Sequence, residues 1–278
     1  MALKPERRKM RTNIKYLTGA YLLFLVLLLC SSYASGIFSE IVYYSSFILP
    51  VFAVIYLKKS AFENPFDIVK IKKERLDTAL ALSLPGIGVI MGISALTTLI
   101  FDAFGLPIEE VSTEPHFLLS VLNLALLPAI GEELLFRYLP MKLILPHSPR
   151  VCVLLSAVMF SMAHTSIEAF AYAFAAGVFF MVIDICSGSI LPSVIAHFIN
   201  NVISLMFIYF DDNNRLIIGF YVMFSLLLII SLVYFALKRK KIISKIYAAF
   251  SAGEPMGADL VPLAFILPCL LLAIENLL

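Results

Sequence analysis

The chain has 278 residues, of which 61% are apolar and only 14% are charged, and its formal net charge is +2. Soluble globular proteins carry roughly 25% charged residues, so the composition excludes an ordinary soluble domain. The sequence has no basic stripe interleaved with aromatic residues, so it carries no signature of nucleic-acid binding. The four cysteines are scattered without a C-x-x-C pair, and we interpret them as packing residues rather than metal or redox ligands.

Successive apolar runs predict an all-α, polytopic transmembrane helix bundle of about eight spans. A helix needs about 20 apolar residues to cross a hydrocarbon core of about 30 Å. The first run follows a basic segment, as in a signal peptide, but it is long and further spans follow, so we expect an uncleaved helix. The predicted spans are residues 16–36, 38–57, 78–103, 117–140, 150–168, 169–187, 189–210 and 216–237.

The placement of Lys and Arg predicts the orientation of the bundle. If the N-terminus lies in the cytoplasm, every Lys and Arg except Arg215 falls in a cytoplasmic segment. The basic connection 58–77 is either a short helix on the anionic inner surface or a solvated loop. We expect a cytoplasmic basic N-terminus at 1–15, a bundle at 16–237 with a catalytic core at about 117–210, and a basic segment with an apolar tail at 238–278.

The tail is ambiguous. Its apolar stretch 260–274 is interrupted by Pro262 and Pro268 and is short for a span. A ninth crossing, a re-entrant piece and a helix lying on the bundle are all open readings.

Charged side chains at bilayer depth are costly, so those in the predicted spans are candidates for function. In the fourth span Glu132 and Glu133 are adjacent, and Arg137 follows Glu133 by four residues, the favoured order for an ion pair on one helix face. Such a pair would leave Glu132 pointing about 100° away around the helix, where it could act as a general base. The alternative is a buried ion-pair network that only holds helices together.

Two later spans add polar side chains. His164 closes a Phe160-x-x-x-His164 spacing in the fifth span, and His197 and Asn201 share one face of the seventh. The pair on the seventh span is either interhelical glue or a set of donors for a developing oxyanion. Asp184 has no place in this set, and we interpret it as a polar anchor or a turn residue.

The depths in the membrane that are predicted for these groups differ from one another. At about 1.5 Å per residue, the glutamates and His197 lie about 10 Å from the inner surface and His164 about 20 Å. They meet only if the fifth helix begins in the cytoplasm or the fourth is tilted.

The three spacings resemble the CPBP family, which comprises CAAX-type prenyl proteases and bacteriocin-processing enzymes and is also called the Abi family. They occur in the order of that family, within residues of about 117–210. The matching motifs are Glu132-Glu133-x-x-x-Arg137, Phe160-x-x-x-His164 and His197-x-x-x-Asn201.

The resemblance implies a glutamate-dependent intramembrane endopeptidase without a cofactor. Glu132 and His164 would activate a water molecule, and His197 with Asn201 would stabilise the oxyanion. Glu133 and its arginine would hold the site together. The implied partners are a peptide or prenylated-protein substrate and the lipid bilayer. A bacterial plasma membrane, with the site open toward the cytoplasm, is the expected location.

Three other functions compete with this one. Glu132, His164 and His197 are ligand types of a catalytic Zn2+ site, although no H-E-x-x-H helix is present. A serine peptidase lacks its G-x-S-x-G motif. A non-catalytic bacteriocin-immunity factor or scaffold would keep the same bundle, whereas transport is disfavoured because no inverted repeat is apparent.

Overall fold

A computed structural model describes residues 5–64, 68–71, 73–106, 113, 116–164, 166–210 and 214–251. Every regular element within this part of the chain is helical, which confirms the all-α prediction. Seven helices are long and apolar enough to cross a membrane, and an eighth, α7, is apolar but short. The expected alternatives for the apolar stretch 260–274 lie outside the described residues.

The main helices follow the predicted spans in order, but the first of them already begins at Pro5, within the predicted N-terminal segment 1–15, whereas the prediction placed its start at residue 16. They are α1 (Pro5–Ser32), α2 (Ile37–Leu57), α3 (Lys73–Ala103), α7 (Pro149–Met162), α8 (Ile167–Ser187), α9 (Leu191–Tyr209) and α10 (Asn214–Ser251). Between α3 and α7 one continuous helical rod covers Phe117–Leu143. It is divided into α4 (Phe117–Ser120), the π-helical η2 (Val121–Leu126), α5 (Leu127–Glu133), the π-helical η3 (Leu134–Tyr138) and α6 (Leu139–Leu143).

The predicted fifth span, 150–168, is wrong in length. Helix α7 has 14 residues, about 21 Å, and ends at Met162. The chain then turns, and Ser166 starts α8 by accepting a hydrogen bond from the Ala169 backbone N–H at 3.4 Å. His164 therefore lies in the turn after α7 and not inside a transmembrane helix.

The connection 58–77 is mostly irregular. In its described residues only the 3-10 turn η1 (Lys59–Ala61) is helical before α3 begins at Lys73. The Ile68 carbonyl accepts from the Ile190 N–H at 2.8 Å, and the Val69 carbonyl accepts from the Ser189 hydroxyl at 3.0 Å. These bonds attach the connection to the turn between α8 and α9, which agrees with the loop alternative.

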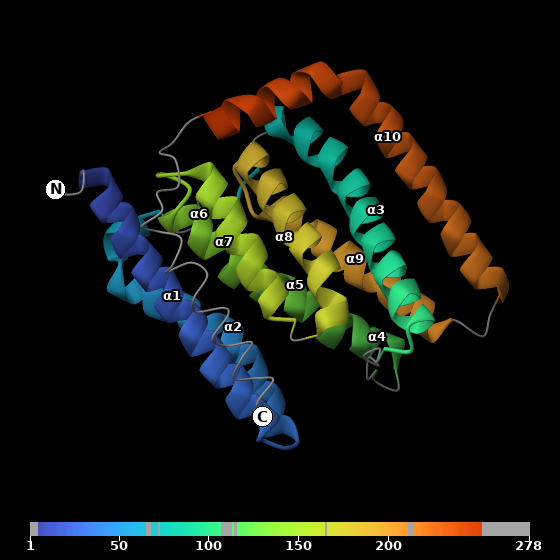
Figure 1. Cartoon of the computed structure of the whole chain (residues 1–278), viewed down its shortest axis with the longest axis horizontal. Coiled ribbons are helices and arrows are strands. Elements are labelled where there is room, and N and C mark those ends of the chain that lie inside the picture. Colours follow the sequence, from blue (N-terminus) through green and yellow to red (C-terminus); the bar gives the residue numbers. More distant parts are fainter. Residues whose placement is uncertain are drawn as a thin grey trace.

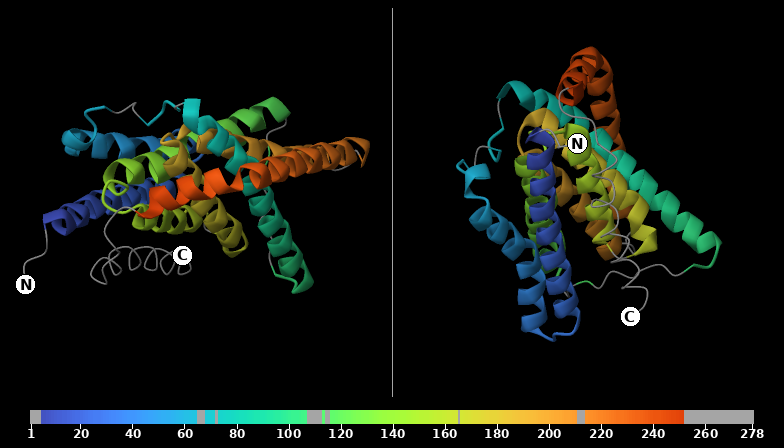
Figure 2. Two further views of the ribbon diagram at one scale, coloured as in Figure 1. Left: turned by 90° about the horizontal axis from the view of Figure 1, so that it is seen from above. Right: turned by 60° about the vertical axis from the view of Figure 1, so that its left-hand side comes forward.

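Two helix groups make up the bundle. Helices α1 and α2 form an antiparallel pair at one side of the molecule (Figures 1 and 2). In the other group α8 packs against both α3 and α7. Gly177 of α8 allows a close approach to α7, because a Cβ at this position would lie 2.5 Å from the Ala157 Cα.

Helix α10 extends well beyond the predicted span 216–237. It has 38 residues, about 57 Å, which exceeds the thickness of a bilayer core. Figure 1 shows it running along α3 and then bending across the ends of α3 and α8. Lys241 and Lys245 of its second part place their Nζ atoms 2.6 and 3.2 Å from the Asp77 carboxylate. The basic segment is thus a continuation of the last helix.

Candidate active site

Two prolines interrupt the backbone of the rod that carries the glutamates. Pro128 has no N–H for the carbonyl of Leu124, four residues earlier, and Pro140 has none for the carbonyl of Phe136. Both positions lie in or beside the π-helical segments, which occur preferentially at functional sites. Side chains from other helices donate to both carbonyls: the Asn201 amide to Leu124 at 3.4 Å and the Ser156 hydroxyl to Phe136 at 2.7 Å.

Glu133 and Arg137 form the ion pair that their spacing suggests. Arg137 Nη1 lies 3.1 Å from Glu133 Oε1, and neither side chain has any exposed surface. The guanidinium carbon sits 4.0 Å from the ring centroid of Phe160 and 5.4 Å from that of Phe180. Two aromatic faces therefore surround the arginine, and its charge is directed at Glu133.

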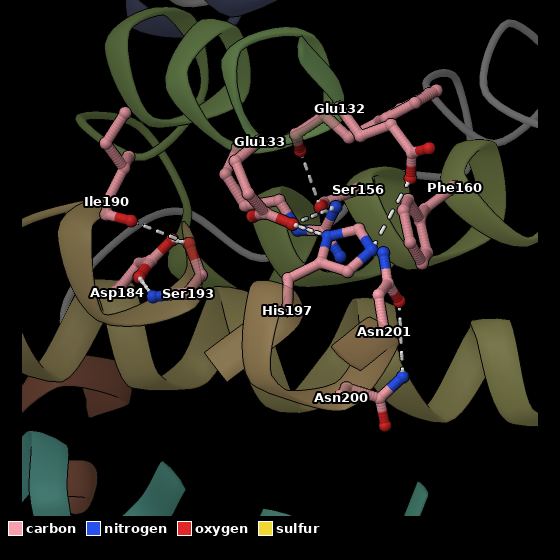
Figure 3. A network of polar contacts seen from close by, with 12 residues as sticks. Glu132, Glu133, Ser156, Phe160, Asp184, Ile190, Ser193, His197, Asn200 and Asn201 are labelled. Carbon is pink, nitrogen blue, oxygen red and sulfur yellow. Dashed lines mark hydrogen bonds and ion pairs between the residues drawn. The ribbon is translucent and has the colours of Figure 1, made fainter. Parts of the chain in front are cut away.

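His197 joins the two glutamates (Figure 3). Its Nδ1 donates to Glu133 Oε1 at 2.8 Å, and its Nε2 lies 3.8 Å from Glu132 Oε2. The ring stacks on Phe180 and presents an edge to Phe160, at centroid distances of 5.5 and 5.7 Å. These contacts hold the imidazole between one acid that is already paired and one that is not.

The adjacent glutamates differ in their surroundings. The Glu133 side chain is fully buried and its Oε1 contacts both Arg137 and His197, whereas the Glu132 side chain is 12% exposed. Within the part of the chain that the structure describes, Oε2 of each glutamate has no hydrogen-bond partner, so the difference lies in the exposure and in the contacts of Oε1. Of the two acids, Glu132 is the one available to a substrate or a water molecule.

His164 contacts the ring of Phe160, and that ring in turn contacts His197. Its Nδ1 lies 2.9 Å from the Phe160 carbonyl oxygen, which can only accept, so Nδ1 carries the hydrogen. The Phe160 ring is 4.7 Å from His164 and 5.7 Å from His197 between centroids. No hydrogen bond or ion pair among the described residues joins His164 to Glu132 or His197.

Asn201 lies one turn of α9 beyond His197, as its spacing predicts. One hydrogen of its amide group is directed to the Leu124 carbonyl, and its Oδ1 lies 3.5 Å from the Asn200 amide nitrogen. The second amide hydrogen has no acceptor in the described residues. Asn201 thus has a structural contact and a spare donor.

Sequence reasoning missed several side chains that support the cluster. Phe180 and Ser156 looked like ordinary residues of apolar helices, and their contacts depend on how helices pack. Asp184 was noticed but given no role, and Ser193, to which it is bonded, was not noticed at all. The one indication of this contact in the sequence was that Asp184 is a carboxylate within an apolar span.

The arrangement offers no ready metal site. A catalytic zinc ion needs three protein ligands about 2 Å from one point. Within the described residues no three His, Cys, Asp or Glu side chains come together in this way. Glu132, His164 and His197 do not fit the ion as placed.

A comparison with protein families supports the motif resemblance. Residues 114–203 match the family model "Type II CAAX prenyl endopeptidase Rce1-like". The match ends in α9 after Asn201 and contains all six motif residues with a proposed role, while α1–α3 and α10 lie outside it. No curated protein and no solved structure matches the chain. Residues 114–203 are therefore similar to the Rce1-like type II CAAX prenyl endopeptidases, in agreement with the motif resemblance, and the seven long apolar helices support an integral membrane protein.

Proposed function

We propose that the protein is an intramembrane endopeptidase in which Glu132 and His164 activate the attacking water. The unequal surroundings of the two glutamates carry this proposal. Oε2 of each glutamate lacks a hydrogen-bond partner among the described residues. Glu133, however, is fully buried and held by Arg137 and His197 at 3.1 and 2.8 Å, so the carboxylate with a free oxygen that water can reach is that of the partly exposed Glu132. A general base must keep such an oxygen free for the proton that it removes.

The reaction follows from these groups. Glu132 takes a proton from water while the water oxygen bonds to the scissile carbonyl carbon and the carbonyl oxygen gains the negative charge. When the tetrahedral intermediate collapses, the C=O bond re-forms, the C–N bond breaks, and Glu132 returns the proton to the leaving amine. His164 Nε2 is an acceptor in the neutral ring, because Nδ1 already donates to Phe160, and it orients the same water.

Asn201 and His197 are the proposed donors to the oxyanion. Asn201 retains one amide hydrogen beside the one directed at Leu124. His197 Nδ1 donates to Glu133, so donation from Nε2 requires a doubly protonated ring. Preorganised donors of this kind act on the charge that develops in the transition state.

Zinc-dependent hydrolysis is the second candidate. Both histidines use Nδ1 for an outer hydrogen bond, to Glu133 and to the Phe160 carbonyl, as metal-bound histidines commonly do. The described side chains do not converge on one point, however. We therefore derive no step through a metal and leave this alternative to a chelator experiment.

The family description suggests the substrate class. That description names a CAAX prenyl endopeptidase, and we propose a lipidated or membrane-bound peptide as substrate. A leader peptide, as in bacteriocin processing, is the alternative. We place the protein in a bacterial plasma membrane with its N-terminus in the cytoplasm, since the basic residues concentrate on that side.

The test is turnover of quenched fluorescent peptides by purified protein in liposomes. One peptide ends in a farnesylated CAAX sequence, and a second is identical but not prenylated. Glu132→Gln should lower kcat about 100-fold or more, and His164→Ala should also lower it. Asp77→Asn, which alters a carboxylate bound to α10 and not to the site, is the matched control.

The outcomes separate the candidate functions. Cleavage that survives a strong chelator and disappears in Glu132→Gln supports the proposal. Loss of cleavage with chelator, and its recovery with Zn2+, would favour the metal mechanism. Binding of the peptides without cleavage by folded wild-type protein would identify a non-catalytic scaffold.

A further inference from the structure

The turn between α8 and α9 contains a fully buried carboxylate that the proposed chemistry does not use. Asp184, in the last turn of α8, accepts a hydrogen bond from the Ser193 N–H at 3.2 Å, and its Oδ2 lies 2.7 Å from the Ser193 hydroxyl. That hydroxyl also lies 2.9 Å from the Ile190 carbonyl, so its one hydrogen is shared between the two acceptors. Ser193 is the third residue of α9, where a backbone N–H has no partner inside its own helix. Asp184 thus supplies the cap of α9 from the preceding helix.

The first turn of α9 depends on this contact. Ile190, at the usual capping position, provides no side-chain bond, and Pro192 has no N–H. The Leu191 N–H is accepted by the Ser189 hydroxyl at 3.1 Å, and the Val194 N–H by the Ile190 carbonyl at 3.1 Å. Asp184 therefore accounts for the one N–H of this turn that remains.

The same residue also closes α8. Its backbone carbonyl accepts from the Gly188 N–H at 2.7 Å and from the Ser187 hydroxyl at 3.1 Å. Gly188 adopts a φ of 69°, a conformation that a glycine tolerates without strain. Asp184 therefore bonds both to the end of α8 and to the start of α9.

This junction lies one helical turn from the catalytic cluster. Ser193 and His197 are four residues apart and share a face of α9. His197 is the residue that contacts Glu133 at 2.8 Å and approaches Glu132 at 3.8 Å. In Figure 3 the bonded pair Asp184 and Ser193 lies beside Glu133 and His197.

Hydrogen bonds weaken over a few tenths of an ångström and with misaligned donors. A small rotation or shift of the first turn of α9 would move the His197 ring against both glutamates. Glu133 lies on the rod Phe117–Leu143 and not on α9, so a shift of α9 alone changes its distance from His197.

We propose that Asp184 is a positioning residue, which fixes the first turn of α9 through Ser193 and so sets the imidazole of His197 against Glu133 and Glu132. The inference rests on the proposed function, because it assigns Asp184 to the same reaction. Asp184 does not contact substrate. Its effect passes through its two hydrogen bonds and not through its charge.

Three variants and one control test the proposal on the peptide used above. Asp184→Ala should lower kcat about 10- to 100-fold, with KM within about twofold of wild type. Asp184→Asn keeps an acceptor for the Ser193 N–H and should restore kcat to within about threefold of wild type. Ser193→Ala removes the hydroxyl contacts with Asp184 and with the Ile190 carbonyl but keeps the backbone N–H bond to Asp184, so it should show a smaller loss than Asp184→Ala. Ser83→Ala, whose hydroxyl bonds to the Ala79 carbonyl within α3 and not to this junction, should leave kcat unchanged.

A second measurement does not need turnover. In protein labelled with 15N in its four histidines, the His197 Nδ1–H signal reports the bond to Glu133. It should be lost or broadened in Asp184→Ala and preserved in Asp184→Asn. If wild type shows no cleavage, the proposed function fails, while this spectrum still decides whether Asp184 positions the ring.

Several results would overturn the inference. Wild-type kcat and an unchanged His197 signal in Asp184→Ala would show that the ring is held without Asp184. An Asp184→Asn variant as impaired as Asp184→Ala would show that charge, not hydrogen bonding, is what matters. If Asp184→Ala does not fold, Ser193→Ala decides: unchanged kcat and an unchanged signal in that folded variant would refute the role.

Discussion

Glu133→Gln is the sharpest test of the buried ion pair, because it removes one charge and keeps the shape of the side chain. Glu133 Oε1 lies 3.1 Å from Arg137 Nη1 and 2.8 Å from His197 Nδ1. The glutamine carbonyl can still accept from His197. Arg137, which has no exposed side-chain surface, would lose its anionic partner.

The magnitude follows from that burial. Breaking a fully buried pair by removing one partner costs about 3–5 kcal/mol, because the remaining charge is left without compensation. The contacts of Arg137 with Phe160 and Phe180 are each worth about 0.5–2 kcal/mol, but wild type and variant both contain them. They do not reduce the difference. The double variant Glu133→Gln/Arg137→Met removes both charges and should recover much of the loss.

Reversible unfolding in mixed micelles, titrated with SDS, would measure these free energies. Asp77→Asn is the matched carboxylate control, because its partner Lys241 is mostly exposed, and it should shift the transition far less. A Glu133→Gln protein as stable as this control would refute the reasoning. So would a double variant that is less stable than either single variant.

Three further predictions concern packing, a backbone carbonyl and pH. Gly177→Ala places a Cβ 2.5 Å from the Ala157 Cα, so it should destabilise the α7–α8 contact by about 1–3 kcal/mol and lower the melting temperature. Ser156→Ala removes the donor 2.7 Å from the buried Phe136 carbonyl and should cost about 1–3 kcal/mol in the same unfolding assay. Burial lowers the pKa of His147, which lies in the loop between α6 and α7, so the unfolded chain takes up its proton first as the pH falls. Stability should therefore decline below a pH of about 6.5, and His147→Gln should flatten that decline.

Two matched variants control the packing and hydrogen-bond predictions. A Cβ on Gly19 would meet nothing within 4 Å, so Gly19→Ala should leave the melting temperature at or above that of wild type. Among the described residues Ser83 bonds only to the Ala79 carbonyl within its own helix, so Ser83→Ala should cost less than Ser156→Ala. Equal losses at the paired sites would mean that the close approach and the freed carbonyl are unimportant.

The number and order of helices could be predicted because a bilayer leaves few alternatives. A backbone in hydrocarbon must satisfy its own hydrogen bonds, so each long apolar run becomes a helix. The end of α7 was missed because the polar interruption after Met162, residues 164–166, is only three residues long; Ser166 caps the next helix. The mismatch in depth between His164 and Glu132 was the one sign that this span was placed wrongly.

The candidate site was predictable where its contacts are local in sequence. A spacing of four residues is sufficient to pair Glu133 with Arg137. The bond between His197 and Glu133 crosses from α9 to the rod, and its partner depends on how far one helix is rotated against the other. The spacing of residues within either segment carries no information about that rotation. The role of Asp184 could not be predicted for the same reason, because the sequence does not show which helix start its side chain contacts.

The prolines around the glutamates explain part of that rotation. Pro128 and Pro140 each take a donor from the rod, and the two carbonyls concerned, Leu124 and Phe136, accept instead from α9 and α7. Those are the helices that carry His197 and lead to His164. The interruptions that distort the rod thus also create its attachments to both histidine-bearing segments. In a regular helix both carbonyls would already accept from an N–H four residues later, and the side-chain donors of α9 and α7 would not be needed to satisfy them.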